Sequence, residues 1–276
     1  MVRMNQLDIA RRAQVVKALV EGNSIRATVR MTGVGKNTIV RLLANLGAAC
    51  ARYHDTHVRG LKSRRIQCDE IWSFCYAKQK NVPAEKKGQF GYGDVWTWTA
   101  IDADTKLAAS YLVADRTLNS AHTFMHDLAD RVARRVQLTT DGHKVYLEAV
   151  ESAFGSDVDY SVLQKVYGAN PDETRYSPAK IIGVASEVIT GNPDPRHIST
   201  SFVERQNLTM RMSMRRFTRL TNGFSKKVEN LAFAVALHFM HYNFCRVHQT
   251  LRVTPAMEAG LTDHVWSIEE IVRLLG

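Results

Sequence analysis

At 276 residues, with 45% hydrophobic and 23% charged side chains, the chain has the composition of a globular protein that can bury one large core or two. Its net charge of +10 points to a polyanionic partner such as nucleic acid. No apolar run approaches the ~18 residues of a membrane span, and the first residues lack a signal-peptide core, so we expect an intracellular protein with no membrane partner. The four cysteines have no C-x-x-C spacing, which argues against a zinc knuckle or a disulfide framework.

Residues 1–48 predict a small all-α domain. Apolar residues recur at helical spacing over 7–22, Ser24 can cap a second helix, and the glycines of 33–35 predict a tight turn before a third helix. Helix, glycine turn and helix in this order resemble the helix-turn-helix of DNA-binding proteins. Four side chains are then expected to contact DNA from the exposed start of the third helix: Lys36, Asn37, Thr38 and Arg41. The alternative is a helical bundle with a solvated basic face.

Residues 49–64 predict a basic linker, and Arg64 and Arg65 at its end are expected to contact DNA phosphates. Beyond it, strands are predicted at 65–77, 95–102, 106–114, 136–140 and 158–166, with helices at 119–133 and 143–154. Meandering strands followed by alternating strands and helices predict an α/β fold (mixed α+β), with helices on the faces of a mixed sheet. That order of elements resembles the ribonuclease-H-like fold.

This core is expected to span 65–245, with an insertion at 169–199 and a C-terminal helical tail at 246–276. The insertion holds four of the six prolines, and Ile181–Ile189 within it fits a strand or a short helix equally well. Three tryptophans lie in predicted strands and are expected in the core: Trp72, Trp96 and Trp98.

Three acids stand out by their positions. Asp69 lies inside a predicted strand, where a carboxylate is disfavoured. Asp141 follows a strand at its carboxyl end, where open α/β sheets place ligand-binding residues. Glu204 lies in the first turn of a predicted helix over 200–216. On a ribonuclease-H-like sheet the first and fourth strands are neighbours, so the two aspartates can meet and a helix across the face can add Glu204. Three carboxylates suit Mg²⁺, with Mn²⁺ as a substitute.

Each acid also has a simpler interpretation. Glu70 is an alternative to Asp69, because adjacent strand residues face opposite ways. Asp141 can be a turn residue, and Ser201 to Glu204 match a capping box. Around Glu204, however, a polar ridge lies beside the apolar stripe of the helix and fits a cleft for metal and phosphate. The ridge residues expected to contact DNA are Asn207, Arg211 and Arg215.

These residues resemble a known family, the DDE transposases of bacterial insertion sequences, and most closely the IS-one family. The resemblance covers roughly 65–245 and is clearest at Thr139-Thr140-Asp141-Gly142 and at Ser201-Phe202-Val203-Glu204-Arg205-Gln206-Asn207-Leu208. It continues through Phe224-Ser225-Lys226-Lys227. Such transposases usually begin with a cysteine zinc finger, and this sequence has none.

The resemblance implies a catalytic, metal-binding triad of Asp69, Asp141 and Glu204. It implies Mg²⁺-dependent cleavage at terminal inverted repeats and strand transfer into target DNA, both double-stranded. Because two ends must be joined, a homodimer or higher homo-oligomer is expected, in the cytoplasm with the nucleoid. Two other functions fit the same residues: a catalytically inactive, transposase-derived DNA-binding regulator, and a ribonuclease-H-like nuclease that cleaves without joining.

Overall fold

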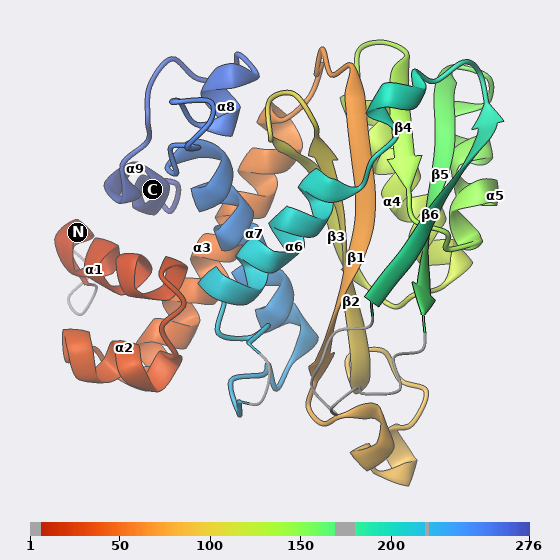
Figure 1. Ribbon diagram of the computed structural model, residues 1–276. Coiled ribbons are helices and arrows are strands. Elements are labelled where there is room, and N and C mark those ends of the chain that lie inside the picture. The colour runs from red at the N-terminus through yellow and green to blue at the C-terminus, as the bar shows by residue number, and fades with distance from the viewer. Residues whose placement is uncertain (1–6, 169–179, 219–220) are drawn as a thin grey trace.

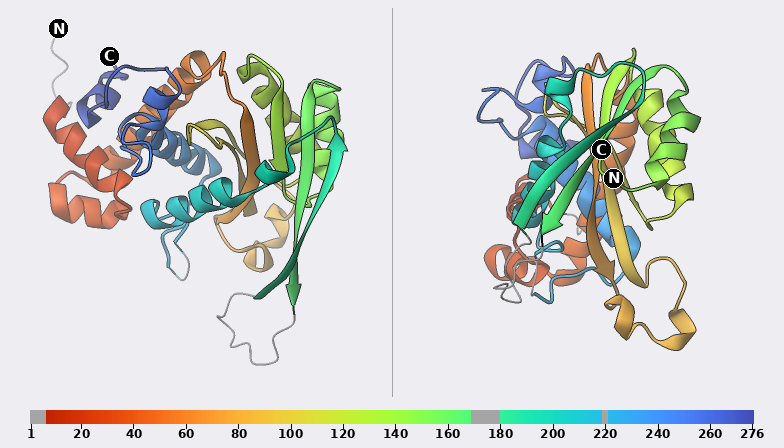
Figure 2. Two further views of the ribbon diagram at one scale, coloured as in Figure 1. Left: turned by 45° about the horizontal axis from the view of Figure 1, so that its top comes forward. Right: turned by 45° about the vertical axis from the view of Figure 1, so that its right-hand side comes forward.

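The computed structural model describes residues 7–168, 180–218 and 221–276, and within them a mixed sheet carries helices on both faces (Figure 1, Figure 2). The strands are β1 (Arg65–Cys75), β2 (Gly93–Asp102), β3 (Ala108–Ala114), β4 (Val136–Thr140), β5 (Val158–Gly168) and β6 (Lys180–Thr190). The helices are α1 (Ile9–Val20), α2 (Ile25–Thr32), α3 (Lys36–His57), α4 (Leu118–Arg131), α5 (Val145–Phe154), α6 (Ser201–Ser213), α7 (Val228–Phe244), α8 (Pro255–Glu258) and α9 (Ile268–Arg273). The predicted mixed α/β class is confirmed. None of these helices is long and apolar enough to cross a bilayer.

The sheet has the order β3-β2-β1-β4-β5-β6. Strand β1 is antiparallel to β2 and parallel to β4, which is in turn parallel to β5. The predicted neighbourhood of the first and fourth strands is therefore confirmed. In the parallel register Cys68 lies opposite Thr140, so the residues that follow them, Asp69 and Asp141, emerge side by side.

The side chains of β1 alternate between two apolar layers, as a strand covered on both faces requires. Ile71 and Cys75 pack with residues of α6 and α7, such as Val203. Cys68 packs on the opposite face, with Trp98 and residues of α4 and α5. Figure 2 shows the α4 and α5 pair on one side of the sheet and α6 on the other. The alternation puts Asp69 and Glu70 on opposite faces of the strand.

The segment predicted as an insertion contributes to the sheet. Strand β6 pairs antiparallel with β5 along Tyr160 to Gly168, so Ile181–Ile189 is a strand. It forms an edge of the sheet (Figure 1). Of the predicted insertion, 169–179 lie outside the described residues.

The predicted linker over 49–64 is largely helical. Helix α3 continues to His57, with Cys50 and His54 buried in the core. The segment was predicted as a linker because it is rich in basic residues. In the structure these cations lie on the exposed side of the helix. Apolar residues nevertheless continue at helical spacing, and no glycine or proline interrupts 48–57.

The N-terminal helices have the predicted turn. The Ser24 hydroxyl caps α2 by accepting a hydrogen bond from the Ala27 amide (3.0 Å), and Gly33 ends the helix in the left-handed region at φ 68°. Helix α9 of the C-terminal tail contacts α1, and Ile271 lies in the same apolar cluster as Ala13. The two ends of the described chain therefore lie together (Figure 1).

Gly47 lets α3 and α7 come into close contact. A Cβ atom added to Gly47 would lie 2.4 Å from the Phe233 carbonyl oxygen and 2.5 Å from its Cβ, and backbone cannot yield as a flexible side chain does. We expect Gly47→Ala to destabilise the protein by about 1–3 kcal/mol, measured by denaturant unfolding. Gly183→Ala is the control, because its added methyl would meet only Val166 at 3.9 Å. Equal stability of the two variants would contradict this helix contact.

Candidate metal centre

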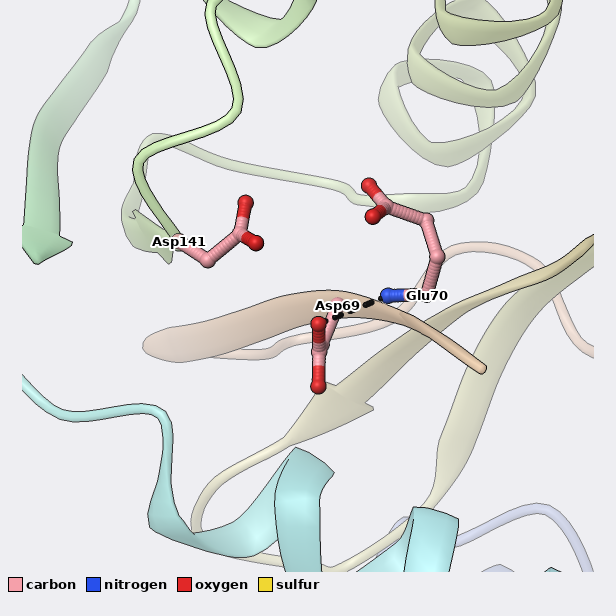
Figure 3. A group of neighbouring side chains, drawn as sticks. All are labelled: Asp69, Glu70 and Asp141. Carbon is pink, nitrogen blue, oxygen red and sulfur yellow. Dashed lines mark hydrogen bonds between the residues drawn. The ribbon is translucent and has the colours of Figure 1, made fainter. Parts of the chain in front are cut away.

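Three carboxylates converge where β1 meets the end of β4. One carboxylate oxygen from each of Asp69, Glu70 and Asp141 lies within 4.8 Å of the other two. Figure 3 shows Asp69 and Glu70 leaving β1 toward opposite sides, with the Asp141 carboxylate facing the pair. The register of two parallel strands thus brings together acids that are far apart in the sequence.

Asp69 is half-buried, and its charge is only partly compensated. Its Oδ1 accepts a hydrogen bond from the Glu70 amide and its Oδ2 accepts one from the Asn207 side chain, both at 2.8 Å. Burial and the neighbouring charge of Asp141 raise the pKa of Asp69 to about 7, and Glu204 adds to the rise. The site therefore holds more negative charge than its protein partners balance.

Glu70 belongs to the same acidic group from the other face of β1. Its side chain is 1% exposed, and its carboxylate forms an ion pair with Arg116 at 3.1 Å. Burial and the charge of Asp141 raise the pKa of Glu70 to about 7, which Tyr146 and Arg116 partly oppose. Arg116 also lies 3.8 Å from Asp141. The alternatives Asp69 and Glu70 are thus both at the site, and only Glu70 has a cationic partner among the described residues.

Polar atoms around the acids indicate that a cation fits there. Among the described residues, Asn207 Oδ1 is buried without a hydrogen-bond partner, and buried Glu70 Oε1 has only the Tyr146 hydroxyl near it. Each such atom costs ~1–3 kcal/mol. A hydrated Mg²⁺ prefers carboxylate and amide oxygens and brings water molecules that can pair with the rest. The donor set therefore fits a hard divalent cation.

Helix α6 is held over the site by β1 itself. The Gln67 side-chain oxygen accepts hydrogen bonds from the amides of Phe202 (2.8 Å) and Val203 (3.3 Å) at the start of the helix. The Asn207 amide reaches Asp69 one turn further on. Since Glu204 lies one turn before Asn207, its Cβ is about 5–6 Å from that of Asn207, on the ridge that faces the aspartates.

The structure places Glu204 beside the three-acid group and bonded to other partners. Its carboxylate forms an ion pair with Lys165 of β5 and accepts a hydrogen bond from the Thr200 hydroxyl (2.5 Å). The capping-box interpretation is wrong, because α6 is N-capped by Thr200 and not by Ser201. Glu204 is therefore close enough to raise the pKa of Asp69, while its own charge is paired with Lys165.

The Lys165–Glu204 ion pair is expected to compete with metal for the glutamate. Both side chains are partly exposed (22% and 37%), so their pairing is worth only ~0–1 kcal/mol. Lys165→Met should therefore lower the Mg²⁺ concentration for half-maximal thermal stabilisation by up to about fivefold. Lys165→Arg, which keeps the charge, should change it little. Weaker metal binding by Lys165→Met would show that the lysine supports the site instead of competing with it.

A cleft of about 880 Å³ lies between the N-terminal helices and the segment after α6. Its described lining includes no carboxylate and six basic side chains: Arg26, Lys36, Arg215, Arg216, Lys226 and Lys227. Two predicted DNA contacts, Lys36 and Arg215, therefore face one basic cleft. Of the other predicted contacts, Asn37 and Arg41 are exposed, Thr38 is half-buried, and Arg211 is half-buried on α6.

Arg64 and Arg65 lie away from the acids. They line a second cavity of about 480 Å³ at the start of β1, with Arg134 and Arg135. Arg65 forms an ion pair with Asp104. Asp69 follows Arg65 by four residues of extended strand, a distance of about 13 Å. The predicted phosphate contacts are therefore not part of the acid site.

Three residues of the site were missed by sequence reasoning. Arg116 follows β3, Gln67 precedes Asp69 by two residues, and Lys165 lies in β5. Only the alternation of β1 offered a signal, since it puts Gln67 on the same face as Asp69. The positions of Arg116 and Lys165 depend on strand order, and no local pattern encodes that order.

The sequence matches no protein-family model and no curated protein. Among solved structures, the chain is similar to a piggyBac transposase in a synaptic complex with hairpin DNA. The TM-score is 0.37 and the identity 10%, over 97% of this chain and 69% of that one. Similarity of this extent assigns no function, so the function has to be inferred from the residues of the site.

Proposed function

We propose that this chain is a DDE-type DNA transposase that cleaves DNA at the ends of a mobile element and transfers the freed strand into target DNA. The observation that carries the proposal is the parallel register of β1 and β4, which sets Asp69 beside Asp141 beneath the polar ridge of α6. An acidic site of this kind suits phosphodiester chemistry, in which charge must be stabilised on both the attacking and the leaving oxygen.

In this proposal Asp69 and Asp141 hold Mg²⁺, or Mn²⁺ in its place, and Glu204 joins them when it leaves Lys165. When bound, such ions activate the attacking oxygen and stabilise the leaving one. The chain's own residues orient this arrangement. Asn207 fixes one oxygen of Asp69, and Arg116 lies between Glu70 and Asp141, where its charge limits repulsion among the acids.

DNA binding is supported by charge. The basic cleft offers six cations to a phosphate backbone. Lys36 at the start of α3 belongs to that cleft, and Asn37 and Arg41 beside it are exposed, as base contacts from a recognition helix require. We infer that α2 and α3 act as a helix-turn-helix on terminal inverted repeats and that the cleft guides the same duplex toward the acids.

The finer assignment to the IS-one family rests on the sequence resemblance around Asp141 and Glu204. This assignment implies a homodimer or higher homo-oligomer, because two element ends are joined in one reaction. It also implies action on the bacterial nucleoid in the cytoplasm. The division into a DNA-binding domain over 1–48 and a catalytic core over 65–245 is part of the same proposal.

The test begins with selection of a DNA ligand, because the repeat sequence is unknown. Duplexes enriched from a random-sequence pool by the full chain would be labelled and incubated with Mg²⁺ and a supercoiled plasmid. A transposase cleaves the duplex and joins the freed end to the plasmid. Cleavage without joining would instead identify a nuclease, and binding without cleavage would identify a DNA-binding regulator.

A further inference from the structure

Aromatic rings lie on the surface beyond the acids, along β1 and β2. Trp72 is 39% exposed, and Trp96 and Phe74 are half-buried. The sequence prediction that Trp72 and Trp96 are core residues is therefore wrong, whereas Trp98 is fully buried as predicted. We call the group Trp72, Phe74, Trp96 and Phe224 the aromatic platform.

The rings of the platform are close to one another. Trp72 lies opposite Trp96 in the antiparallel register, where Cβ atoms are about 5 Å apart. The Trp72 and Phe74 ring centroids are 5.7 Å apart, and those of Phe74 and Phe224 are 4.6 Å apart. The platform therefore extends from β2 across β1 to the segment before α7.

The platform adjoins the acidic group, and Arg116 contacts both. Trp72 follows Glu70 by two residues on the same face of β1, about 7 Å along the strand. The Arg116 guanidinium lies 4.6 Å from the centre of the Trp96 ring while it pairs with Glu70 and lies 3.8 Å from Asp141. A group bound at Glu70 and Asp141 would therefore have the platform as its neighbour on this face of β1.

Cations accompany the rings. Lys226 lies 4.0 Å over the Phe224 ring, and both residues line the basic cleft. Arg116 supplies a second cation at Trp96. Exposed rings alternating with cations bind single-stranded nucleic acid, because bases stack on the rings while phosphates pair with the cations. An interface between protein chains would be expected to have a more apolar centre.

We propose that the aromatic platform stacks unpaired bases of the DNA strand whose phosphate lies at Asp69 and Asp141. This inference rests on the proposed function and adds to it that the duplex opens next to the site of cleavage. A base that leaves its partner loses stacking in the duplex, and Trp72 replaces that stacking. The platform thereby selects DNA that is unpaired, or easily unpaired, at this position.

The test compares two labelled probes bound by the full chain with Ca²⁺ in place of Mg²⁺. One is a fully paired random-sequence duplex, and the other is the same duplex ending in a short unpaired fork that contains 2-aminopurine. The wild-type chain should bind the fork more tightly and quench its fluorescence. Trp72→Leu, which keeps an apolar side chain without a ring, should weaken fork binding about tenfold and abolish the quench. Trp72→Phe should restore much of both.

Affinity for the paired duplex separates the two proposals. If the wild-type chain binds neither probe, the proposed function fails and the platform fails with it. If it binds the paired duplex without preferring the fork, only the platform proposal is overturned. If Trp72→Leu loses affinity for both probes equally, the platform proposal is also overturned, since the tryptophan would then have a structural role. If Trp72→Leu changes the sedimentation of the protein but not its DNA binding, the platform is a self-association surface instead.

Discussion

Asp141→Asn is expected to abolish Mg²⁺-dependent cleavage of the selected duplex. The side chain keeps its shape but loses the charge that holds the cation between β1 and β4. Stabilisation of the transition state by metal is worth several kcal/mol, so we expect a loss of about a thousandfold or more in rate. Cleavage of end-labelled duplex, followed by gel electrophoresis at saturating DNA, measures it.

The matched control is Asp157→Asn, which makes the same change at an exposed position just before β5; the Asp157 side chain is 78% exposed. It should cleave at the wild-type rate. DNA binding by Asp141→Asn should be retained, because the basic cleft does not include Asp141. Near-normal cleavage by Asp141→Asn would exclude the acid site as the catalytic centre, and loss of binding in parallel would point to misfolding.

Asp69→Asn is expected to make the protein more stable without metal and less stable than the wild type when metal is added. Without metal, the raised pKa of Asp69, about 7, means that the folded protein binds a proton more tightly than the unfolded chain does. This favourable contribution is present below pH ~4 and is lost as the pH rises to ~7. An uncharged asparagine avoids that loss, so the variant should be the more stable protein at pH 8, by up to about 4 kcal/mol.

With Mg²⁺ the order should invert, since the cation stabilises the wild-type acids and binds the variant poorly. The measurement is the difference in melting temperature between the two proteins, from pH 4 to 8, in chelator and in Mg²⁺. The difference between the two proteins is used because two buried histidines also make stability depend on pH. Burial lowers the pKa of His54 to about 4 and that of His238 to about 3. Those histidines give a stability that rises with pH up to about 6.5, and they contribute equally to both proteins. A difference that does not depend on pH would contradict the charge assigned to Asp69.

Strand and helix positions could be read from the sequence because they follow from local spacing. The five predicted strands and the helix before Val136 were found within a few residues, since period-2 and period-3.6 patterns decide which side chains a single element can bury. The linker over 49–64 was the main error in the chain before the core. There a basic composition outweighed the helical spacing that leads to the buried Cys50 and His54.

Burial of the tryptophans could not be predicted from strand content alone. Trp72 and Trp98 are both strand residues on the side of the sheet covered by α4 and α5, yet only Trp98 lies beneath these helices, with Phe124 and Tyr146. Trp72 lies beyond them and stays exposed. The lengths and positions of the covering helices, and not the alternation within β1, decide which ring is in the core.

The sequence by itself determined where the acids lie on their elements: Asp69 inside a strand, Asp141 at a strand end and Glu204 in the first turn of a helix. These placements depend on interactions among residues close together in the chain. The meeting of Asp69 and Asp141 was expected from the resemblance to a known fold, and the strand register confirms it. Only the tertiary structure decided that Glu70 joins them from the opposite face and that Glu204 pairs with Lys165. Those relations depend on strand register and on the docking of α6, which arise from contacts between segments far apart in the sequence.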